Sequence, residues 1–297
     1  MLSKKSFLSQ SIVVSRHTLQ VDARSRSYTV VMPKVPQKSP PLFIVFHGSH
    51  QTGEKFRAFG GNVFDELVQE HSCVVVYPDG YKGHWNDARI SSNFPTRKAG
   101  TDDGAFTKAL IDEMSAKHDI DANRVYIAGY SNGGQMVIRL IHEWPYPFAG
   151  AVLIGATQPD AANFLVAPRE TSLPILMIHG TSDPIVPYNG GVASLWGLSP
   201  RGPGLSAHET VHYYAQRNHI DSKPTTTTLQ HEGKNVLQVT FEEYTETGKY
   251  PVRLVSISGG GHVVPNPYKK AAFVLGKTAT QVNSAELLWD FFQQQNE

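Results

Sequence analysis

Residues 125–143 read VYIAGYSNGGQMVIRLIHE, and this stretch decides the fold. Its first residues are apolar without alternation, which is typical of a strand that is buried on both faces. Its second half carries an apolar stripe at helical spacing. Between the two lies Gly129-Tyr130-Ser131-Asn132-Gly133, a G-x-S-x-G sequence. A strand, a glycine-rich turn and a helix in this order predict a nucleophile elbow, in which a serine stands on a sharp turn above the sheet edge.

Similar elements recur on both sides of this stretch. The short apolar runs are Leu42–Phe46, Cys73–Tyr77, Val125–Ala128, Ala151–Ile154 and Ile175–Ile178. Helical patterns separate them, at Gly61–Glu70, Asp103–Lys117 and Gly133–Glu143. This alternation predicts βαβ units and an α/β fold with a doubly wound, mostly parallel central sheet. We also expect a hairpin over residues 11–33, two later strands at Val236–Tyr244 and Val252–Ile257, and a final helix at Ala285–Gln294.

Composition limits the functional classes. Lys and Arg total 27 against 26 for Asp and Glu, so the net charge is +1, which argues against a nucleic-acid binder. No apolar run reaches the roughly 18 residues that a membrane span requires. Cys73 is the single cysteine, which excludes an intrachain disulfide and a Cys-based zinc site. Since residues 1–10 also lack the apolar stretch of a secretory signal, we expect a cytoplasmic location. We expect one domain over residues 1–297, with candidate lid loops at 78–101 and 184–206.

A nucleophilic serine needs a base, and the base needs an acid that orients it. On this type of sheet the acid and then the histidine follow the serine in the chain, each after a late strand. Asp183 follows the run Ile175–Ile178, and His262 follows Val252–Ile257 behind three glycines. The sequence therefore predicts Ser131, Asp183 and His262 as the catalytic residues.

An acyl-transfer site also needs N–H donors for the oxyanion of the tetrahedral intermediate. The N–H of Asn132, directly after the nucleophile, is one candidate. The second is expected in the loop after the first central strand, where we select Ser49. His47 in the same loop precedes the serine in the chain, so we interpret it as a structural residue that shapes the loop.

With these residues in place, the chain resembles an α/β-hydrolase-fold esterase. More closely, it is similar to the polyhydroxybutyrate depolymerase and feruloyl esterase group of carbohydrate esterase family 1. The matching segments are Phe46–Gly53, Val74–Gly80, Asp102–Phe106, Arg124–Met136, His179–Tyr188 and Gly259–His262. The resemblance implies the same three catalytic residues. This sequence departs from the pattern of the group at Val263-Val264-Pro265, where members commonly carry Trp-Pro. The departure leaves substrate choice open.

A competing signature is His208-Glu209-Thr210-Val211-His212, an H-E-x-x-H sequence. On a helix its two imidazoles could bind zinc with Glu209 as base, and Glu232 could be a third ligand. This zinc metallohydrolase is the alternative of another class. The strand alternation and the elbow have no role in such a site, however. The segment also fits a surface helix that buries Val211, Tyr214 and Ala215.

The expected reaction is two-step acyl transfer on small or oligomeric esters, such as hydroxyalkanoate oligomers and phenolic or acetyl esters. It needs no metal or organic cofactor. A peptidase or a thioesterase with the same triad is the alternative within this fold. Trp85, Tyr188 and Trp196 are candidate substrate-binding residues, or else they pack the loops onto the domain. The expected partner is the ester substrate, with no nucleic acid and no membrane span, and nothing in the sequence indicates an oligomeric state.

Overall fold

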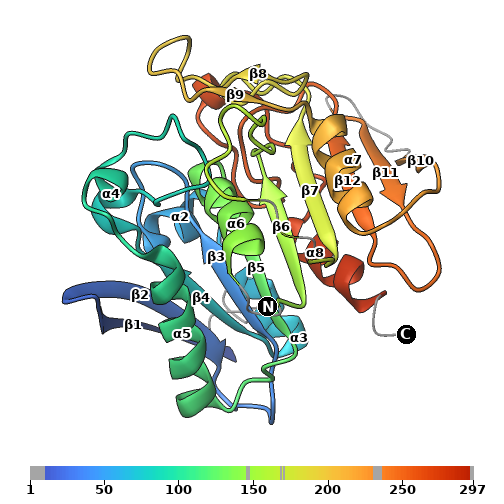
Figure 1. Cartoon of the computed structure of the whole chain (residues 1–297). Helices are drawn as coiled ribbons and strands as arrows, with labels where there is room; N and C mark the ends of the chain where they lie inside the picture. Colours follow the sequence, from blue (N-terminus) through green and yellow to red (C-terminus); the bar gives the residue numbers. More distant parts are fainter. Residues whose placement is uncertain (1–10, 145–147, 168, 170, 230–235, 295–297) are drawn as a thin grey trace.

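The computed structural model describes residues 11–144, 148–167, 169, 171–229 and 236–294, and its centre is a ten-stranded sheet (Figure 1). The strands of this sheet are β1 (Ile12–Val21), β2 (Arg24–Pro33), β3 (Leu42–Phe46), β4 (Val74–Pro78), β5 (Val125–Tyr130), β6 (Gly150–Ile154), β7 (Ile175–Gly180), β10 (Thr225–Leu229), β11 (Val239–Tyr244) and β12 (Val252–Ile257). Their order is β1-β2-β4-β3-β5-β6-β7-β12-β11-β10. The six strands from β4 to β12 in this order are parallel, and antiparallel strands flank them on both sides.

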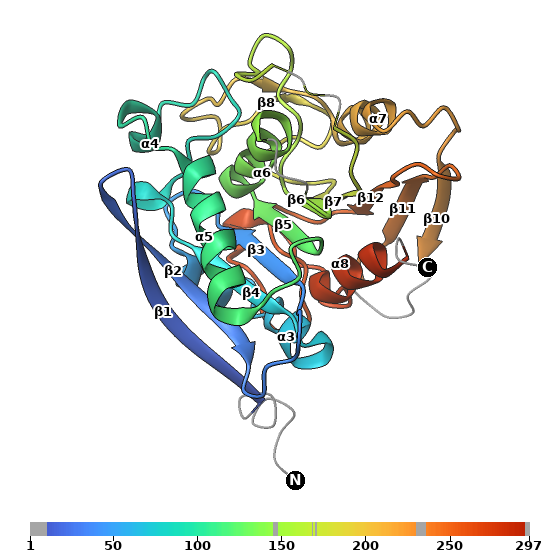
Figure 2. The ribbon, with the colours of Figure 1, turned by 60° about the horizontal axis from the view of Figure 1, so that its bottom comes forward.

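Helices cover both faces of the sheet (Figures 1 and 2). The α-helices are α2 (Gly53–Phe59), α3 (Asp65–His71), α4 (Pro95–Lys98), α5 (Asp103–His118), α6 (Asn132–Glu143), α7 (Ala207–Arg217) and α8 (Ser284–Gln293). Helices α5, α6 and α7 pack on one face, and α2, α3 and α8 pack on the other. Alternate residues of β3 enter the two cores, which explains why the central runs are apolar without a polar face.

Shorter elements complete the structure. They are the 3₁₀ turns η1 (Tyr81–Gly83) and η2 (Phe273–Leu275) and the two-stranded sheet of β8 (Gly191–Val192) and β9 (Pro203–Gly204). Among the described residues, none of the helices has the length and apolar character needed to cross a bilayer.

The five predicted apolar runs are all strands of the parallel sheet, and the expected hairpin is β1 and β2. The helix predicted over Gly61–Glu70 starts later, at Asp65, because Gly61 and Asn62 both adopt positive φ angles, of 68° and 61°. A separate helix, α2, precedes this turn and was not predicted. The expected helix with buried Val211, Tyr214 and Ala215 is α7.

A buried ion pair ties the N-terminal hairpin to helix α5. Nη2 of Arg26 on β2 lies 2.7 Å from Oδ1 of Asp103 at the start of α5, and their side chains are 4% and 0% exposed. Oδ2 of Asp103 accepts a hydrogen bond from the Asn86 N–H at 2.8 Å. The Arg26 guanidinium also lies over the Phe106 ring. Asp102, the preceding residue, caps α5 by accepting from the Ala105 N–H at 2.8 Å.

We predict that Asp103→Ala destabilises the protein by about 3–5 kcal/mol, because it leaves the buried Arg26 charge without a partner. Urea denaturation at pH 7 measures this change. Asp112→Ala is the matched control, since Asp112 pairs with Lys108 at the surface and the expected loss is under about 1 kcal/mol. Equal losses in the two variants would contradict the assigned role of the buried pair.

Candidate active site

Ser131 occupies a sharp turn between β5 and α6. Its φ and ψ angles are 55° and −115°, a region that residues with a side chain rarely enter. The turn is possible because the backbone segments around it approach very closely. A Cβ atom on Gly133 would lie 2.2 Å from the Phe46 carbonyl oxygen, and one on Gly129 would lie 2.2 Å from the Gly133 carbonyl oxygen. The predicted elbow is therefore present, with Ser131 at its apex.

Asp183 and His262 meet at the same edge of the sheet. Nδ1 of His262 lies 2.7 Å from Oδ2 of Asp183, and their side chains are 3% and 0% exposed. Oδ1 of Asp183 accepts from the N–H groups of Ile185 and Val186, both at 2.8 Å. Burial by itself would raise the pKa of Asp183. The charge of His262 and hydrogen bonds from His179 and His262 outweigh it and hold that pKa well below its usual range.

Neighbours that sequence reasoning did not identify fix the His262 ring. The Tyr130 hydroxyl donates to the His262 carbonyl oxygen at 2.8 Å, and the two rings lie 4.9 Å apart. The His262 N–H donates to the Leu275 carbonyl oxygen at 2.7 Å. Nε2 of His179 lies 3.4 Å from Oδ2 of Asp183. Since Nδ1 of His262 faces Asp183, Nε2 is the ring nitrogen that this pair leaves unused.

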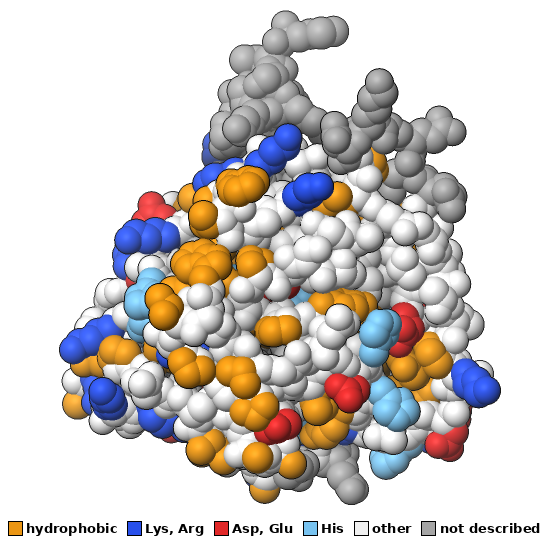
Figure 3. All heavy atoms as spheres, turned by 90° about the horizontal axis from the view of Figure 1, so that it is seen from above, with side chains coloured by type: hydrophobic (Ala, Val, Ile, Leu, Met, Phe, Trp, Pro, Cys, Tyr) orange, Lys and Arg blue, Asp and Glu red, His pale blue; other side chains and the backbone are white. Residues whose placement is uncertain are grey.

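A cavity of about 210 Å³ opens at this edge, and both Ser131 and His262 line it. Other lining residues come from the two segments expected as lid loops, Arg89 and Phe94 from 78–101, and Ile185, Leu195 and Arg201 from 184–206. Figure 3 looks onto this edge and shows hydrophobic side chains over much of the face, with Lys and Arg toward its margin. The cavity gives a small substrate access to the serine.

The two expected oxyanion donors both reach this cavity, because Ser49 and Asn132 line it. Asn132 is the first residue of α6, so its N–H has no partner within the helix. Neither this N–H nor that of Ser49 donates a hydrogen bond to another described residue.

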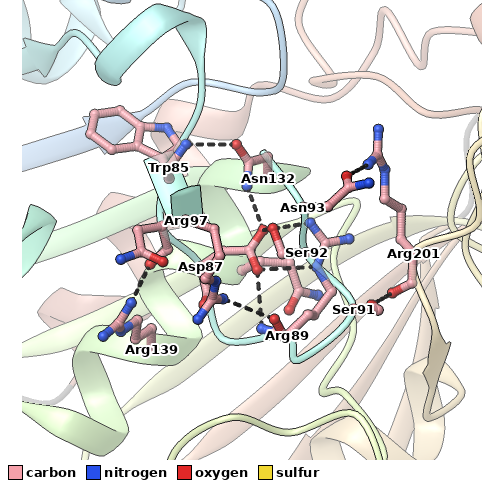
Figure 4. Close-up of polar contacts among 12 residues, drawn as sticks. Trp85, Asp87, Arg89, Ser91, Ser92, Asn93, Arg97, Asn132, Arg139 and Arg201 are labelled. Atoms are coloured by element: carbon pink, nitrogen blue, oxygen red, sulfur yellow. Dashed lines mark hydrogen bonds and ion pairs between the residues drawn. The ribbon is translucent and has the colours of Figure 1, made fainter. Parts of the chain in front are cut away.

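The Asn132 side chain holds the helix start in place (Figure 4). Its Oδ1 accepts from the backbone N–H of Trp85 at 2.9 Å, and its Nδ2 donates to Oδ2 of Asp87 at 2.6 Å. Asp87 is fully buried and also pairs with Arg89. Sequence reasoning missed Asp87, Arg89 and Arg201, because they lie in long loops that carry no periodic pattern.

His47 shapes the loop that carries Ser49. Its Nε2 accepts from the Gly80 N–H at 2.8 Å, which places the ring proton on Nδ1, 2.6 Å from the Gly48 carbonyl oxygen. Burial lowers the pKa of His47 to about 4, so the ring is neutral at pH 7. These contacts agree with the structural role that we expected for His47.

The structure does not bring the three candidate substrate-binding aromatics to the cavity. Trp85 is fully buried, and its indole N–H donates to the His47 carbonyl oxygen at 2.9 Å. Tyr188 is 9% exposed, and its hydroxyl contacts His208 and Ser256. Trp196 is 52% exposed, and its indole N–H donates to the Val274 carbonyl oxygen at 3.3 Å. The packing interpretation of these loop aromatics is the one that the contacts favour.

The H-E-x-x-H segment lies on α7, and its polar groups have structural partners. Nδ1 of His208 pairs with Glu242 at 2.8 Å. The carboxylate of Glu209 accepts from the Ser206 N–H at 2.8 Å and completes a capping box. Within the described ranges, no three His, Cys, Asp or Glu side chains gather as a metal site. Glu232, the candidate third ligand, lies outside the described residues.

Comparisons with known proteins show which family this chain resembles. The family model described as phospholipase/carboxylesterase matches residues 29–212. The "Putative esterase NocK" of Nocardia uniformis subsp. tsuyamanensis is 28% identical over 290 residues, which cover 91% of this chain and 80% of that protein. The poly(3-hydroxyalkanoate) depolymerase C of Paucimonas lemoignei is 29% identical over 64% of this chain, and the match spans 49% of the depolymerase.

One further relative and one solved structure also match this chain. Feruloyl esterase B of Piromyces equi is 27% identical over 76% of this chain, and the match covers 40% of that enzyme. Among solved structures, the acetyl xylan esterase from Aspergillus awamori superimposes with a TM-score of 0.58. That match covers 85% of this chain and 95% of the esterase at 14% identity, so it shows that the two share a fold.

We predict that acid destabilises the protein partly through His47. Because its folded pKa of about 4 lies below the usual 6.5, the unfolded state binds more protons between these values, and stability falls as the pH drops. Between pH 6.5 and 5 the expected loss from this residue is about 2 kcal/mol. Urea denaturation at pH 7, 6 and 5 measures it.

The variant for this test is His47→Gln, whose amide can keep one donor and one acceptor but does not titrate. It should show a flatter dependence of stability on pH than the wild type. The control is His219→Asn, which removes an exposed histidine with a φ of 59° that asparagine also tolerates. A pH dependence in His47→Gln that is as steep as that of the wild type would contradict the assignment.

Proposed function

Because the chain belongs to the phospholipase/carboxylesterase family, we propose that it is a serine esterase that forms an acyl-enzyme on Ser131. Family membership and the esterases among its relatives identify it as a carboxylic ester hydrolase. The observation that carries the finer proposal is the arrangement at the cavity. His262 contacts Asp183 through Nδ1 at 2.7 Å and lines the same cavity as the strained Ser131.

In the proposed reaction, Nε2 of His262 takes the proton of the Ser131 hydroxyl while Oγ attacks the ester carbonyl carbon. The carbonyl oxygen becomes an oxyanion, which the N–H groups of Asn132 and Ser49 stabilise. The C–O bond to the alcohol then breaks, and the alcohol leaves with the proton from His262. Water repeats the sequence on the acyl-enzyme, releasing the acid and restoring Ser131.

Asp183 supports both steps through its charge. Its low pKa keeps it ionised, so it holds the proton of His262 on Nδ1 and stabilises the imidazolium that forms in each step. Since two backbone N–H groups also fix its other oxygen, the carboxylate is oriented before substrate arrives.

The proposed substrates are small or oligomeric esters. A cavity of about 210 Å³ suits a short acyl group or a few units of an oligomer. The names of the relatives point to hydroxyalkanoate and feruloyl esters as classes to test. The matches cover 49% and 40% of those two relatives, so their substrates are starting points for an ester panel.

We propose that residues 78–101 and 184–206 cover the site within one domain, since both contribute side chains to the cavity wall. We also propose a cytoplasmic location, which the single cysteine among 297 residues favours.

The first test is labelling with a fluorophosphonate, followed by peptide mapping, with and without a chelator. We predict one adduct per chain on Ser131 in both conditions, and none in Ser131→Ala. Ser222→Ala, which alters a serine bonded to the Thr245 carbonyl oxygen, should label like the wild type. Ester hydrolysis that a chelator abolishes, without an adduct on Ser131, would favour the zinc alternative.

We also predict that Asp183→Asn lowers kcat by about 10⁴-fold on a 4-nitrophenyl ester, because the amide would favour the wrong tautomer of His262. Steady-state kinetics measures the change, and a circular dichroism spectrum like that of the wild type shows that folding is retained. A loss below about tenfold would exclude Asp183 as the orienting acid.

A further inference from the structure

The cavity wall has a one-sided charge. It includes two arginines, Arg89 and Arg201, in addition to His50 and His262, and none of the described residues that line it is Asp or Glu. A neutral ester gives no reason for two guanidinium groups at the wall. The two arginines differ in whether a carboxylate of the protein neutralises them.

Arg89 is balanced by a buried carboxylate. Its Nη2 lies 2.5 Å from Oδ2 of Asp87, and its Nε lies 3.3 Å from Oδ1. Asp87 also accepts from the Asn132 side chain, so this pair belongs to the support of the helix start described above. Arg97 approaches the same region but donates to the carbonyl oxygens of Asp87 and Arg89 rather than to a carboxylate. Of the neighbouring arginines Arg89, Arg97 and Arg201, Asp87 thus pairs with Arg89 (Figure 4).

Arg201 has no such partner. Within the described residues, no Asp or Glu oxygen lies within 4.0 Å of its guanidinium. Its polar side-chain contact is a weak one, from Nη1 to Oδ1 of Asn93 at 3.4 Å. Figure 4 shows the guanidinium turned toward Asn93, away from Asp87. The group also lies over the Phe94 ring, 4.3 Å from its centroid, and Phe94 lines the cavity too.

The backbone of Arg201 is nevertheless held firmly. Its N–H donates to the Ala193 carbonyl oxygen at 2.8 Å. Its own carbonyl oxygen accepts from the Ser91 hydroxyl at 2.5 Å and from Nδ2 of Asn163 at 3.1 Å. These bonds join the two loops that form this side of the cavity. Arg201 is therefore a cation that the fold positions at the cavity and leaves without a counter-ion.

The electrostatic surroundings agree with this description. Burial, and then the charge of Arg89, lower the pKa of Arg201, and the charge of Asp87 partly opposes them. Burial, with smaller effects from His50, His47 and Arg201, lowers the pKa of His84 to about 4, again against an opposing effect of Asp87. Because two arginines and no Asp or Glu stand among the described residues of the wall, an anionic group on a substrate would be stabilised there.

We propose that Arg201 recognises a carboxylate on the substrate, so that the preferred substrates are esters that also carry a free carboxylate, such as short hydroxyacid oligomers. This inference rests on the proposed serine-esterase function. The planar guanidinium matches the geometry of a carboxylate, Asn93 contacts only its Nη1, and Arg201 lines the cavity. The small cavity favours a carboxylate of a short acid over the headgroup of a lipid.

The test compares two substrates with the same scissile ester. They are the linear dimer of 3-hydroxybutanoate with a free carboxylate and the same dimer as its primary amide. We expect the wild type to prefer the carboxylate by about tenfold or more in kcat/KM, the range of a charge-assisted hydrogen bond. The preference should shrink as salt is raised from 0.05 to 0.5 M. Arg201→Gln should lose the preference, with a much larger fall in kcat/KM on the carboxylate than on the amide.

Two variants control for charge and geometry. Lys108→Gln removes an exposed cation on α5, outside the cavity wall, and should keep the full preference. Arg201→Lys keeps the charge without the planar fork and should retain part of it. The wild-type comparison and its salt dependence test the proposal even where Arg201→Gln folds poorly.

The outcomes separate this inference from the function on which it rests. If the wild type hydrolyses both dimers equally, or if Arg201→Gln slows both equally, carboxylate recognition by Arg201 is wrong while the esterase assignment stands. If neither dimer nor any neutral ester is hydrolysed and Ser131 does not label, the esterase function itself fails. A stronger response of Arg201→Gln toward an acetyl ester of glycerol phosphate than toward the carboxylate dimer would assign the cation to phosphate and overturn the proposal.

Discussion

The rest of the site depends on a steric constraint, the contact between two backbones at the base of the elbow. Gly133 lies so close to the end of β3 that a methyl group in its place would overlap the Phe46 carbonyl oxygen. This contact sets the distance between the turn that carries Ser131 and the loop that carries Ser49. The proposed nucleophile and the two proposed oxyanion donors are therefore positioned by main-chain packing in the middle of the sheet, where neighbouring strands leave little freedom.

Asn132 connects this centre to the substrate side of the cavity. Asn132 lines the cavity, while its side chain binds Asp87 and the Trp85 backbone. Asp87 in turn fixes Arg89 in the cavity wall. The proposed acid is organised in a similar way, since two N–H groups hold one oxygen of Asp183 and leave the other for His262. Asn132 and His262 thus each have a buried polar partner within the protein.

Sequence reasoning predicted the parts of this structure that follow from local pattern. Continuous apolar runs indicated β3 and β5, and a glycine-flanked serine between strand and helix indicated the elbow. The same reasoning left open whether Trp85 binds substrate or packs its loop, and its indole lies in the core under the His47 loop. Loop aromatics have no period, so the sequence does not tell which face of a loop they occupy. Sequence reasoning did not identify Arg201 for a related reason. Its proposed role depends on the lack of a neighbouring carboxylate, and neighbours across loops can be seen only in the folded chain.

The backbone at Ser131 has a consequence for how such a protein evolves. A φ of 55° with a ψ of −115° suits glycine and costs a residue with a Cβ atom on the order of 1–3 kcal/mol. Glycine at this position would relieve that strain but would remove the proposed nucleophile. Folding and the proposed turnover thus favour different residues at one position of the chain.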